Sequence, residues 1–210
     1  MRTEVDAATI GEAWRGIARR ILADGEASSY DGRATLELLL VTLTVASPDP
    51  ADELIERGAP RERLEWMRAN FASRERVAEL GDADSYATRL FDYAGTGLDQ
   101  VHGVVERLRT DPVSRRAAIT TLQPLTDTAY VPCVSLLDFF NEPRGLSVVA
   151  YCHSIDFGTK GFANLVELAH LQRRVADGVG SPVGALTMVV KSAHVYDDDL
   201  EATRAVLERP

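Results

Sequence analysis

The sequence lacks a long apolar run. No uninterrupted apolar stretch of about 18 residues, the length that a membrane-spanning helix needs, occurs in the 210-residue chain. The first 22 residues alternate charged and apolar side chains in a helical pattern and lack the apolar segment of a signal peptide. We therefore expect a cytoplasmic protein with no membrane partner.

Cysteine is scarce as well. Cys133 and Cys152 are the only two in the chain, too few for a disulfide framework in a protein of this length. Neither cysteine belongs to a CxxC motif, and the histidines lack the HxxxH spacing of a zinc site. The sequence therefore predicts no metal centre.

Positive charge is in short supply, with 23 lysine and arginine residues against 32 aspartate and glutamate residues and a net charge of −9. Binding along the backbone of a long nucleic acid needs a surplus of cations, so we expect no nucleic-acid partner. A single phosphate needs only a few well-placed arginines, and a mononucleotide remains possible.

Helical and strand patterns alternate along the chain. Apolar residues recur at helical spacing in several segments, and short runs rich in β-branched residues predict strands between them. The predicted helices lie at 8–23, within 51–80, and at 98–112, 161–180 and 199–209, and the predicted strands lie within 34–50, 115–124, 133–156 and 183–196. This order predicts an α+β fold, a mixed β-sheet covered by helices, in a single domain over residues 1–210.

The residues alone leave the role of Cys133 open. It follows Pro132 at the start of an apolar strand, where a buried core cysteine and a nucleophile are both compatible with the pattern. Cys152 stands beside His153, but neighbours in a strand point to opposite faces, so we expect a core role for it.

Polar clusters follow the helix at 98–112 and the ends of two strands. Arg115 and Arg116 fit either a solvated edge or a phosphate-binding loop, because the guanidinium group matches phosphate geometry. The segments "YCHSID" and "KSAHVYDD" each place a histidine among polar residues at a strand end. Each signal is weak by itself, and together they indicate a domain that binds a small anion.

Read in order, four segments resemble the thymidylate synthase and pyrimidine nucleotide (dCMP, CMP) hydroxymethylase family. "DPVSRRAAI" is similar to the segment with its arginine pair, and "VPCVSLLDFF" to the segment with its catalytic cysteine. "YCHSIDFGTKGFANLVELAHL" resembles the family's Arg-Ser-x-Asp…Gly-x-Pro-x-Asn stretch, and "SAHVYDDDLEATRAVLERP" its His-x-Tyr segment. The match covers about residues 98 to 210, and the first hundred residues match more loosely.

The resemblance implies folate-dependent one-carbon transfer to C5 of a pyrimidine nucleoside monophosphate, with 5,10-methylenetetrahydrofolate as co-substrate. Cys133 would add as a thiolate to C6 of the ring, which makes C5 nucleophilic, and it would need positive neighbours such as Arg115 or Arg116. Tyr86 would assist removal of the C5 proton. Glu65, chosen over Glu62, would be the general acid.

Binding roles follow from the same resemblance. Ser154 would hold the phosphate, Asp156 would contact the folate pterin or an ordered water, and His194 and Tyr196 would bind the sugar 3′-hydroxyl. Asn164 would read the base edge, and its amide favours uracil, because the cytosine-directed branch has aspartate there. The family's arginine pair reaches the substrate of the other subunit, which implies a homodimer with shared active sites.

The chain departs from the family pattern at several positions. His153 stands where the family has a phosphate-binding arginine, while Lys160 and Phe162 replace a glycine and a proline. Lys160 could replace some of the lost positive charge. The N-terminal phosphate loop is reduced to "SYDGRATLE", which leaves Arg33 as the expected phosphate ligand there.

The resemblance also leaves the product open. The sequence ends at Pro210, about fifty residues before typical synthases, so we expect a short variant without the tail that covers the folate. Such lids exclude water, and water at C5 would give a hydroxymethyl rather than a methyl product. The alternatives are C5-hydroxymethylation of UMP, dUMP, CMP or dCMP, action on an altered substrate such as a ribonucleotide or an antibiotic precursor, and a non-catalytic nucleotide-binding homodimer.

Overall fold

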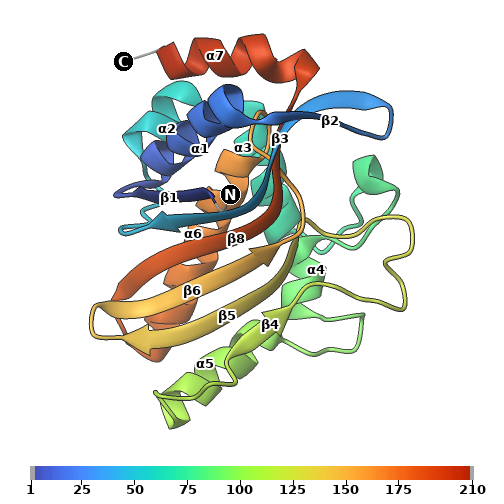
Figure 1. Cartoon of the computed structure of the whole chain (residues 1–210). Helices are drawn as coiled ribbons and strands as arrows, with labels where there is room; N and C mark the ends of the chain where they lie inside the picture. Colours follow the sequence, from blue (N-terminus) through green and yellow to red (C-terminus); the bar gives the residue numbers. More distant parts are fainter. Residues whose placement is uncertain (1–2, 209–210) are drawn as a thin grey trace.

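One mixed sheet organises the chain, whose computed structural model describes residues 3–208. Its strands are β1 (Thr3–Ala7), β2 (Glu26–Tyr30), β3 (Arg33–Val45), β4 (Ala118–Thr120), β5 (Val134–Glu142), β6 (Gly145–Cys152), β7 (Ile155–Asp156) and β8 (Val183–Tyr196). The order across the sheet is β1-β3-β8-β6-β5-β4, with β2 paired to β3 and β7 to β8. Strand β8 is antiparallel to β3 and parallel to β6 (Figure 1).

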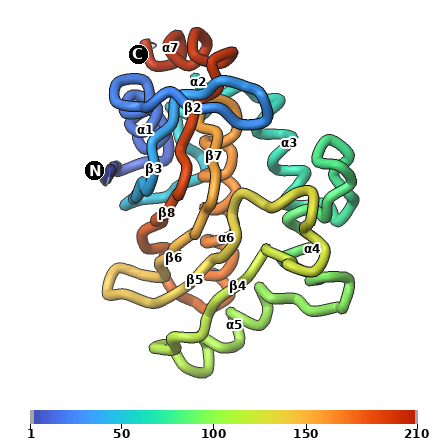
Figure 2. The backbone as a smooth tube through the Cα atoms, turned by 45° about the vertical axis from the view of Figure 1, so that its right-hand side comes forward, coloured from blue at the N-terminus to red at the C-terminus, as the bar shows by residue number. Residues whose placement is uncertain are grey.

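Helices cover one face of this sheet. They are α1 (Ile10–Asp24), α2 (Glu53–Gly58), α3 (Arg61–Ala72), α4 (Tyr86–Phe91), α5 (Gln100–Thr110), α6 (Gly161–Val179) and α7 (Leu200–Glu208), with short 3-10 turns η1 (Ala78–Leu80) and η2 (Asp197–Asp199). In Figures 1 and 2 the long helix α6 runs behind β8 and β6, with α1 beside it. The α+β prediction, a mixed sheet covered by helices, is therefore confirmed.

Alternating side chains explain why the helices lie on this face. Leu186, Met188 and Val190 of β8 are fully buried, as are Val41 and Leu43 of β3 in the matching register. Successive residues of a strand point to opposite faces, so these positions form one apolar surface. The apolar stripe of α1 and most of α6 pack on that surface, with Trp14 of α1 against Phe162 of α6 at 4.7 Å between ring centroids.

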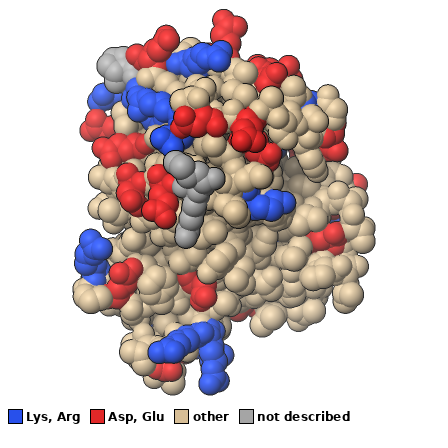
Figure 3. Space-filling view, in the orientation of Figure 1, with Lys and Arg blue, Asp and Glu red and all other residues tan. Residues whose placement is uncertain are grey.

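The opposite face of the sheet is open in both views (Figures 1 and 2). Phe140 of β5 and Tyr151 of β6 are each 41% exposed, and Leu136, Val149 and Val189 beside them are half-buried. Charged side chains are sparse over the middle of this face and gather towards the end that carries α7 (Figure 3). The sheet therefore leaves an extended surface, rich in apolar side chains, in contact with solvent.

Most predicted elements match the structure, and the misses are short. The predicted N-terminal helix, the hairpin between β5 and β6, the long helix α6 and strand β8 all occur. The prediction missed β1, β2 and α4, whose lengths of five, five and six residues are too short for a clear periodic pattern. Within residues 3–208, no helix has the length and apolar content that would carry it across a bilayer.

The single-domain assignment for residues 1–210 stays a prediction. One cluster of buried apolar side chains extends from Ile10 in α1 to Val195 in β8 and is compatible with it.

A buried ion pair fastens α4 to the chain segment that precedes Cys133. Arg89 of α4 is 1% exposed, and its two terminal nitrogens each lie 2.7 Å from an oxygen of Asp127. The guanidinium also donates to the carbonyl oxygens of Thr121 and Asp84. Burial acts to raise the pKa of Asp127, but hydrogen bonds from Arg89 and the backbone N–H of Gln123 outweigh burial and lower this pKa below its usual value of 3.8.

We expect Asp127→Ala to lower the free energy of unfolding by about 3 kcal/mol or more, because Arg89 would keep a buried charge without a counter-ion. Urea denaturation followed by circular dichroism measures this loss. In the native protein the contribution of the pair is present above about pH 4 and is lost as the pH falls through the lowered folded-state pKa of Asp127.

The matched control is Glu53→Ala, which removes one partner of the Arg57–Glu53 pair, whose side chains are 69% and 78% exposed. Exposed pairs contribute about 0.5 kcal/mol or less. Equal losses in the two variants would contradict a special role for the buried pair.

Candidate active site

Most of the predicted site residues lie where strands of the sheet begin or end. Cys133 directly precedes β5, and the backbone N–H of His153, just after β6, donates to the Cys133 carbonyl oxygen at 3.1 Å. Asp156 in β7 pairs in register with His194 of β8. The sheet topology thus brings residues from three sequence segments together at one end of the sheet.

A β-bulge shapes the start of β5. Val134 pairs with Cys152 and Leu136 with Tyr151, so Ser135 is an extra residue on this strand. Bulges bend a strand and re-aim neighbouring side chains, and they are common beside active sites. The Ser135 hydroxyl lies 2.9 Å from Nδ1 of His153, so the bulge also fixes the histidine ring.

Cys133 is half-buried and has a perturbed thiol. Burial raises its pKa above the usual value of 9.0, the positive charge of Lys160 lowers it, and the negative charge of Asp156 raises it. The net shift is upward, so in a single chain the group is mainly a neutral thiol near pH 7. Additional positive charge near this position would favour the thiolate.

Tyr86 lies beside the nucleophile candidate. Its hydroxyl oxygen accepts a hydrogen bond from the backbone N–H of Val134 at 3.0 Å, and its ring stacks on Phe71 with centroids 4.5 Å apart. Burial raises its pKa well above the usual value, and Tyr130 and Cys133 act in the same direction. Tyr86 is therefore a neutral phenol that can act by hydrogen bonding.

A second group lies at the same end of the sheet and consists of His194, Tyr196, Ser154 and Arg33. The His194 ring meets Tyr196 edge to face at 5.0 Å, and its Nδ1 lies 3.5 Å from the Ser154 hydroxyl. The Arg33 guanidinium stands 3.8 Å from the centre of the Tyr196 ring and also pairs with Asp198 at 3.2 Å. Burial lowers the pKa of His194, which favours the neutral imidazole.

Asn164 presents an unused acceptor. It lies in the first turns of α6 and is 2% exposed, and its Nδ2 donates to the Lys160 carbonyl oxygen at 3.1 Å. Its Oδ1 is buried and has no hydrogen-bond partner among residues 3–208. A buried polar atom without a partner is costly, so this oxygen is suited to an N–H group of a ligand.

Asp156 is held by its own turn. One carboxylate oxygen accepts from the backbone N–H groups of Gly158 at 2.9 Å and Thr159 at 3.3 Å, and the other accepts from the Thr159 hydroxyl. The carboxylate is thereby oriented, and it remains half-buried, with room for further acceptor contacts.

His153 does not act as a cation here. Its ring is held by Ser135 and by the backbone of Val131, and burial lowers its pKa below 6.5. A neutral imidazole can donate one hydrogen bond to a phosphate but does not replace the charge of an arginine.

Glu65 and the arginine pair lie away from this group. Glu65 is exposed on α3 and pairs with Arg61 at 3.0 Å. Arg115 and Arg116 follow α5, and the Ala117 carbonyl next to them accepts from the N–H of Phe139, six residues along the chain from Cys133. At about 3.3 Å per strand residue, the distance along β5 from Phe139 to Cys133 is roughly 20 Å. Neither arginine can reach the thiol of its own chain over this distance.

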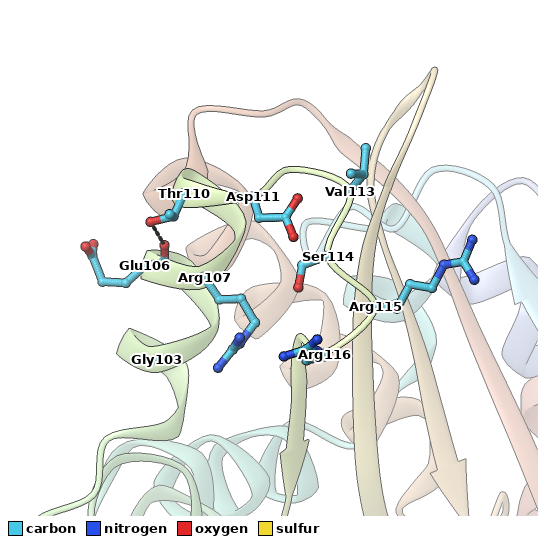
Figure 4. A pocket seen from close by; sticks show the side chains of 9 residues that line it. All are labelled: Gly103, Glu106, Arg107, Thr110, Asp111, Val113, Ser114, Arg115 and Arg116. Atoms are coloured by element: carbon cyan, nitrogen blue, oxygen red, sulfur yellow. Dashed lines mark hydrogen bonds between the residues drawn. The ribbon is translucent and has the colours of Figure 1, made fainter.

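A surface hollow of about 710 Å³ adjoins the arginine pair. Figure 4 shows the guanidinium groups of Arg107 and Arg116 pointing into the same space beneath Ser114, whereas Arg115 points away from it. Both members of the pair are exposed, which leaves them available to a molecule outside this chain.

Sequence reasoning gave no role to Trp66, Tyr130 or Glu37. Trp66 on α3 lies under the Lys160 ammonium, Tyr130 interacts electrostatically with Cys133, and Glu37 on β3 accepts from the Ser192 hydroxyl and pairs in register with His194. No pattern in the sequence distinguishes these three side chains, and only the tertiary arrangement relates them to the candidate site. Within residues 3–208, no cluster of three or more histidine, cysteine or acidic side chains suits a metal ion.

Comparisons with known proteins agree with this geometry. A family model described as thymidylate synthase matches residues 52–210. The "Putative thymidylate synthase" of Methanothermobacter marburgensis is 32% identical over 99% of each chain, and that of Methanosarcina barkeri is 32% identical over 97% of this chain and 94% of its own. The bifunctional dihydrofolate reductase-thymidylate synthase of Leishmania major is 34% identical over 56% of this chain and 24% of its own.

Proposed function

The chain belongs to the thymidylate synthase family, and from this premise we propose that it methylates C5 of a uracil nucleoside monophosphate. The family transfers a one-carbon unit from 5,10-methylenetetrahydrofolate to a pyrimidine nucleotide. The observation that carries the proposal is the unpaired Asn164 Oδ1, buried at the site that also holds Cys133. Asn164 would hydrogen-bond to the edge of the base, and Cys133 would attack its C6 atom.

Cys133 is the proposed nucleophile. Its thiolate would add to C6 of the ring, and the electron pair released towards C5 would make that carbon attack the one-carbon unit. After the C5 proton is lost, tetrahydrofolate would leave and return a hydride to the exocyclic methylene, which gives the methyl group and dihydrofolate and releases the thiolate from C6. Tyr86, neutral and fixed by Val134, would hydrogen-bond near C5 while the C5 proton leaves. Covalent addition of this kind divides one difficult substitution into easier steps.

The base preference rests on Asn164. Because its N–H already donates to the Lys160 carbonyl, the free Oδ1 is left to accept a hydrogen bond. Uracil has an N3–H donor at the matching edge, whereas cytosine has an acceptor at N3. This supports uracil over cytosine.

The remaining substrate contacts are proposed for the group at the strand ends. Ser154 and Arg33 would meet the phosphate, with a neutral hydrogen bond from His153, and His194 and Tyr196 would meet the sugar. Asp156, oriented by its turn, would face the folate pterin. Glu65 stays a prediction as the general acid, and its exposed position and pairing with Arg61 do not favour it.

A homodimer with shared sites completes the proposal. The open sheet face offers apolar side chains to a second copy, and the arginine pair is exposed but roughly 20 Å from the thiol of its own chain. A partner's Arg115 and Arg116 would then supply the phosphate contacts and the positive charge that the Cys133 thiolate lacks. A non-catalytic dimer is disfavoured because Tyr86 is hydrogen-bonded next to Cys133 and Asn164 keeps a buried acceptor available for a ligand.

Release of tritium from C5-tritiated dUMP, with methylenetetrahydrofolate present, tests the activity. Cys133→Ala should lower this rate by about a thousandfold or more, because a covalent nucleophile is lost, whereas Cys152→Ala should have a mild effect. Retention of more than about a tenth of the activity in Cys133→Ala would contradict the addition mechanism.

The nucleotide product identifies the reaction in the same assay. Dihydrofolate formed in step with a methylated nucleotide supports methylation. A hydroxymethyl nucleotide with unoxidised tetrahydrofolate would instead assign hydroxymethylation. Parallel reactions with UMP, CMP and dCMP test the ribonucleotide and cytosine alternatives.

Mixed dimers test the shared site. Cys133→Ala and Arg116→Ala homodimers should both be nearly inactive, but a heterodimer of the two chains has one site with both residues intact. Its activity should recover to about half of the native value per dimer, since one of two sites works. Separate affinity tags allow the heterodimer to be purified, and failure to recover activity would argue against sharing.

Asn164→Asp tests the base preference. A protonated carboxyl group can donate to N3 of cytosine, whereas the amide oxygen accepts from N3–H of uracil, so the ratio of kcat/KM for dUMP over dCMP should fall by about tenfold or more. Asn141→Asp, at a half-buried position on β5 outside the site, is the matched control. An unchanged ratio in Asn164→Asp would mean that another group reads the base.

A further inference from the structure

Lysine is rare in this protein, and one of its two lysines stands at the active site. Lys160 and Lys191 are the only lysines among 23 basic residues. The backbone fixes Lys160 between two site residues: its N–H donates to the Asp156 carbonyl at 3.1 Å, and its own carbonyl accepts from the backbone N–H of Asn164 at 2.9 Å and from the Asn164 side chain. Lys160 is therefore tied into the site rather than placed on a free loop.

The Lys160 side chain has a defined platform. Its ammonium lies 5.5 Å from the centre of the Trp66 ring, which is half-buried on α3. A cation within about 6 Å of an indole face is attracted by the ring. From this position its positive charge acts on Cys133 and favours the thiolate.

Other groups around the thiol do not supply that charge. His153 is neutral and held by Ser135. Asp156 of β7 contributes negative charge. Tyr86 of α4 and Tyr130 in the preceding loop have pKa values raised mainly by burial. Cys152 of β6 is likewise a buried neutral thiol with a raised pKa.

We infer that Lys160 is a positioning residue that acts through Cys133, holding positive charge near the thiol from the position directly before α6. The inference rests on the proposed function in one respect, that Cys133 is the nucleophile. It assigns activation of the thiol partly to the same subunit, before any partner arginine contributes.

The test measures the reactivity of Cys133 without nucleotide or folate. The rate of alkylation by iodoacetamide is followed across pH, with mass spectrometry of the Cys133 peptide, because only the thiolate reacts. Lys160→Gln should move the pH profile upward and slow alkylation near neutral pH by about threefold to tenfold, since one pKa unit changes the thiolate fraction tenfold. Lys160→Arg, which keeps the charge, should stay within about twofold of the native rate.

Two controls separate charge from structural damage. Arg57→Gln removes one positive charge from the exposed face of α2 and should leave the profile unchanged. Cys152, which is 5% exposed, reports opening of the fold, because it is alkylated only if the core loosens. If Lys160→Gln exposes Cys152, Lys160→Met takes its place, because it keeps an apolar stem of similar length beside Trp66.

An unchanged profile in the folded neutral variant would overturn the inference. If alkylation of Cys133 slows as much in Lys160→Arg as in Lys160→Gln, the effect comes from packing and not from charge, which would also overturn the inference. The alkylation result does not depend on turnover. Absence of tritium release from the native protein would contradict the proposed function alone. Alkylation of Lys160→Gln at the native rate would contradict this inference alone.

Discussion

Strand β8 lies between β3 and β6, and its two pairings fix where the candidate residues lie. The parallel pairing with β6 continues into β7, so that Asp156 comes beside His194, and the antiparallel pairing with β3 brings Thr35, two residues after Arg33, beside Tyr196. Side chains alternate along a strand, so a slip of one residue would turn His194 away from the site. The fully buried Leu186, Met188 and Val190 of the same strand anchor this register, which means that core packing and site geometry are set together.

Burial and charge oppose each other at Cys133. A half-buried thiol is protected from bulk water, but loss of solvation disfavours the thiolate and raises the pKa. Lys160 offsets part of this cost, and Asp156 adds to it. The balance in one chain favours the neutral thiol, so added positive charge would favour the thiolate, and the exposed arginine pair of a second chain is the source proposed for it.

The sequence predicted the parts of the site that local patterns encode. Cys133 at the start of β5, the polar ends of β6 and β8, and the start of α6 were all located from strand and helix periodicity and from the family resemblance. Glu65 shows the limit: "RERLEWM" is almost wholly polar, so its helical face is ambiguous, and the structure turns Glu65 to solvent beside Arg61. In the sequence, Lys160 is only a departure from the family pattern. Its contact with Trp66, far earlier in the chain, cannot be predicted from residue spacing, because it depends on how α3 packs near the start of α6.

Two features support the proposed homodimer: the open face of the sheet and the separation of the arginine pair from the thiol. In a two-fold dimer the same surface patch is used by both copies, so a contact made by one chain is repeated by the other. Phe140 and Tyr151 on the open face would be buried by a second copy, and the loop with Arg115 and Arg116, which adjoins β4 at the edge of that sheet, would be carried towards the partner's site. Dimer formation and thiol activation would then be coupled, because positive charge beyond that of Lys160 would reach Cys133 with the second chain.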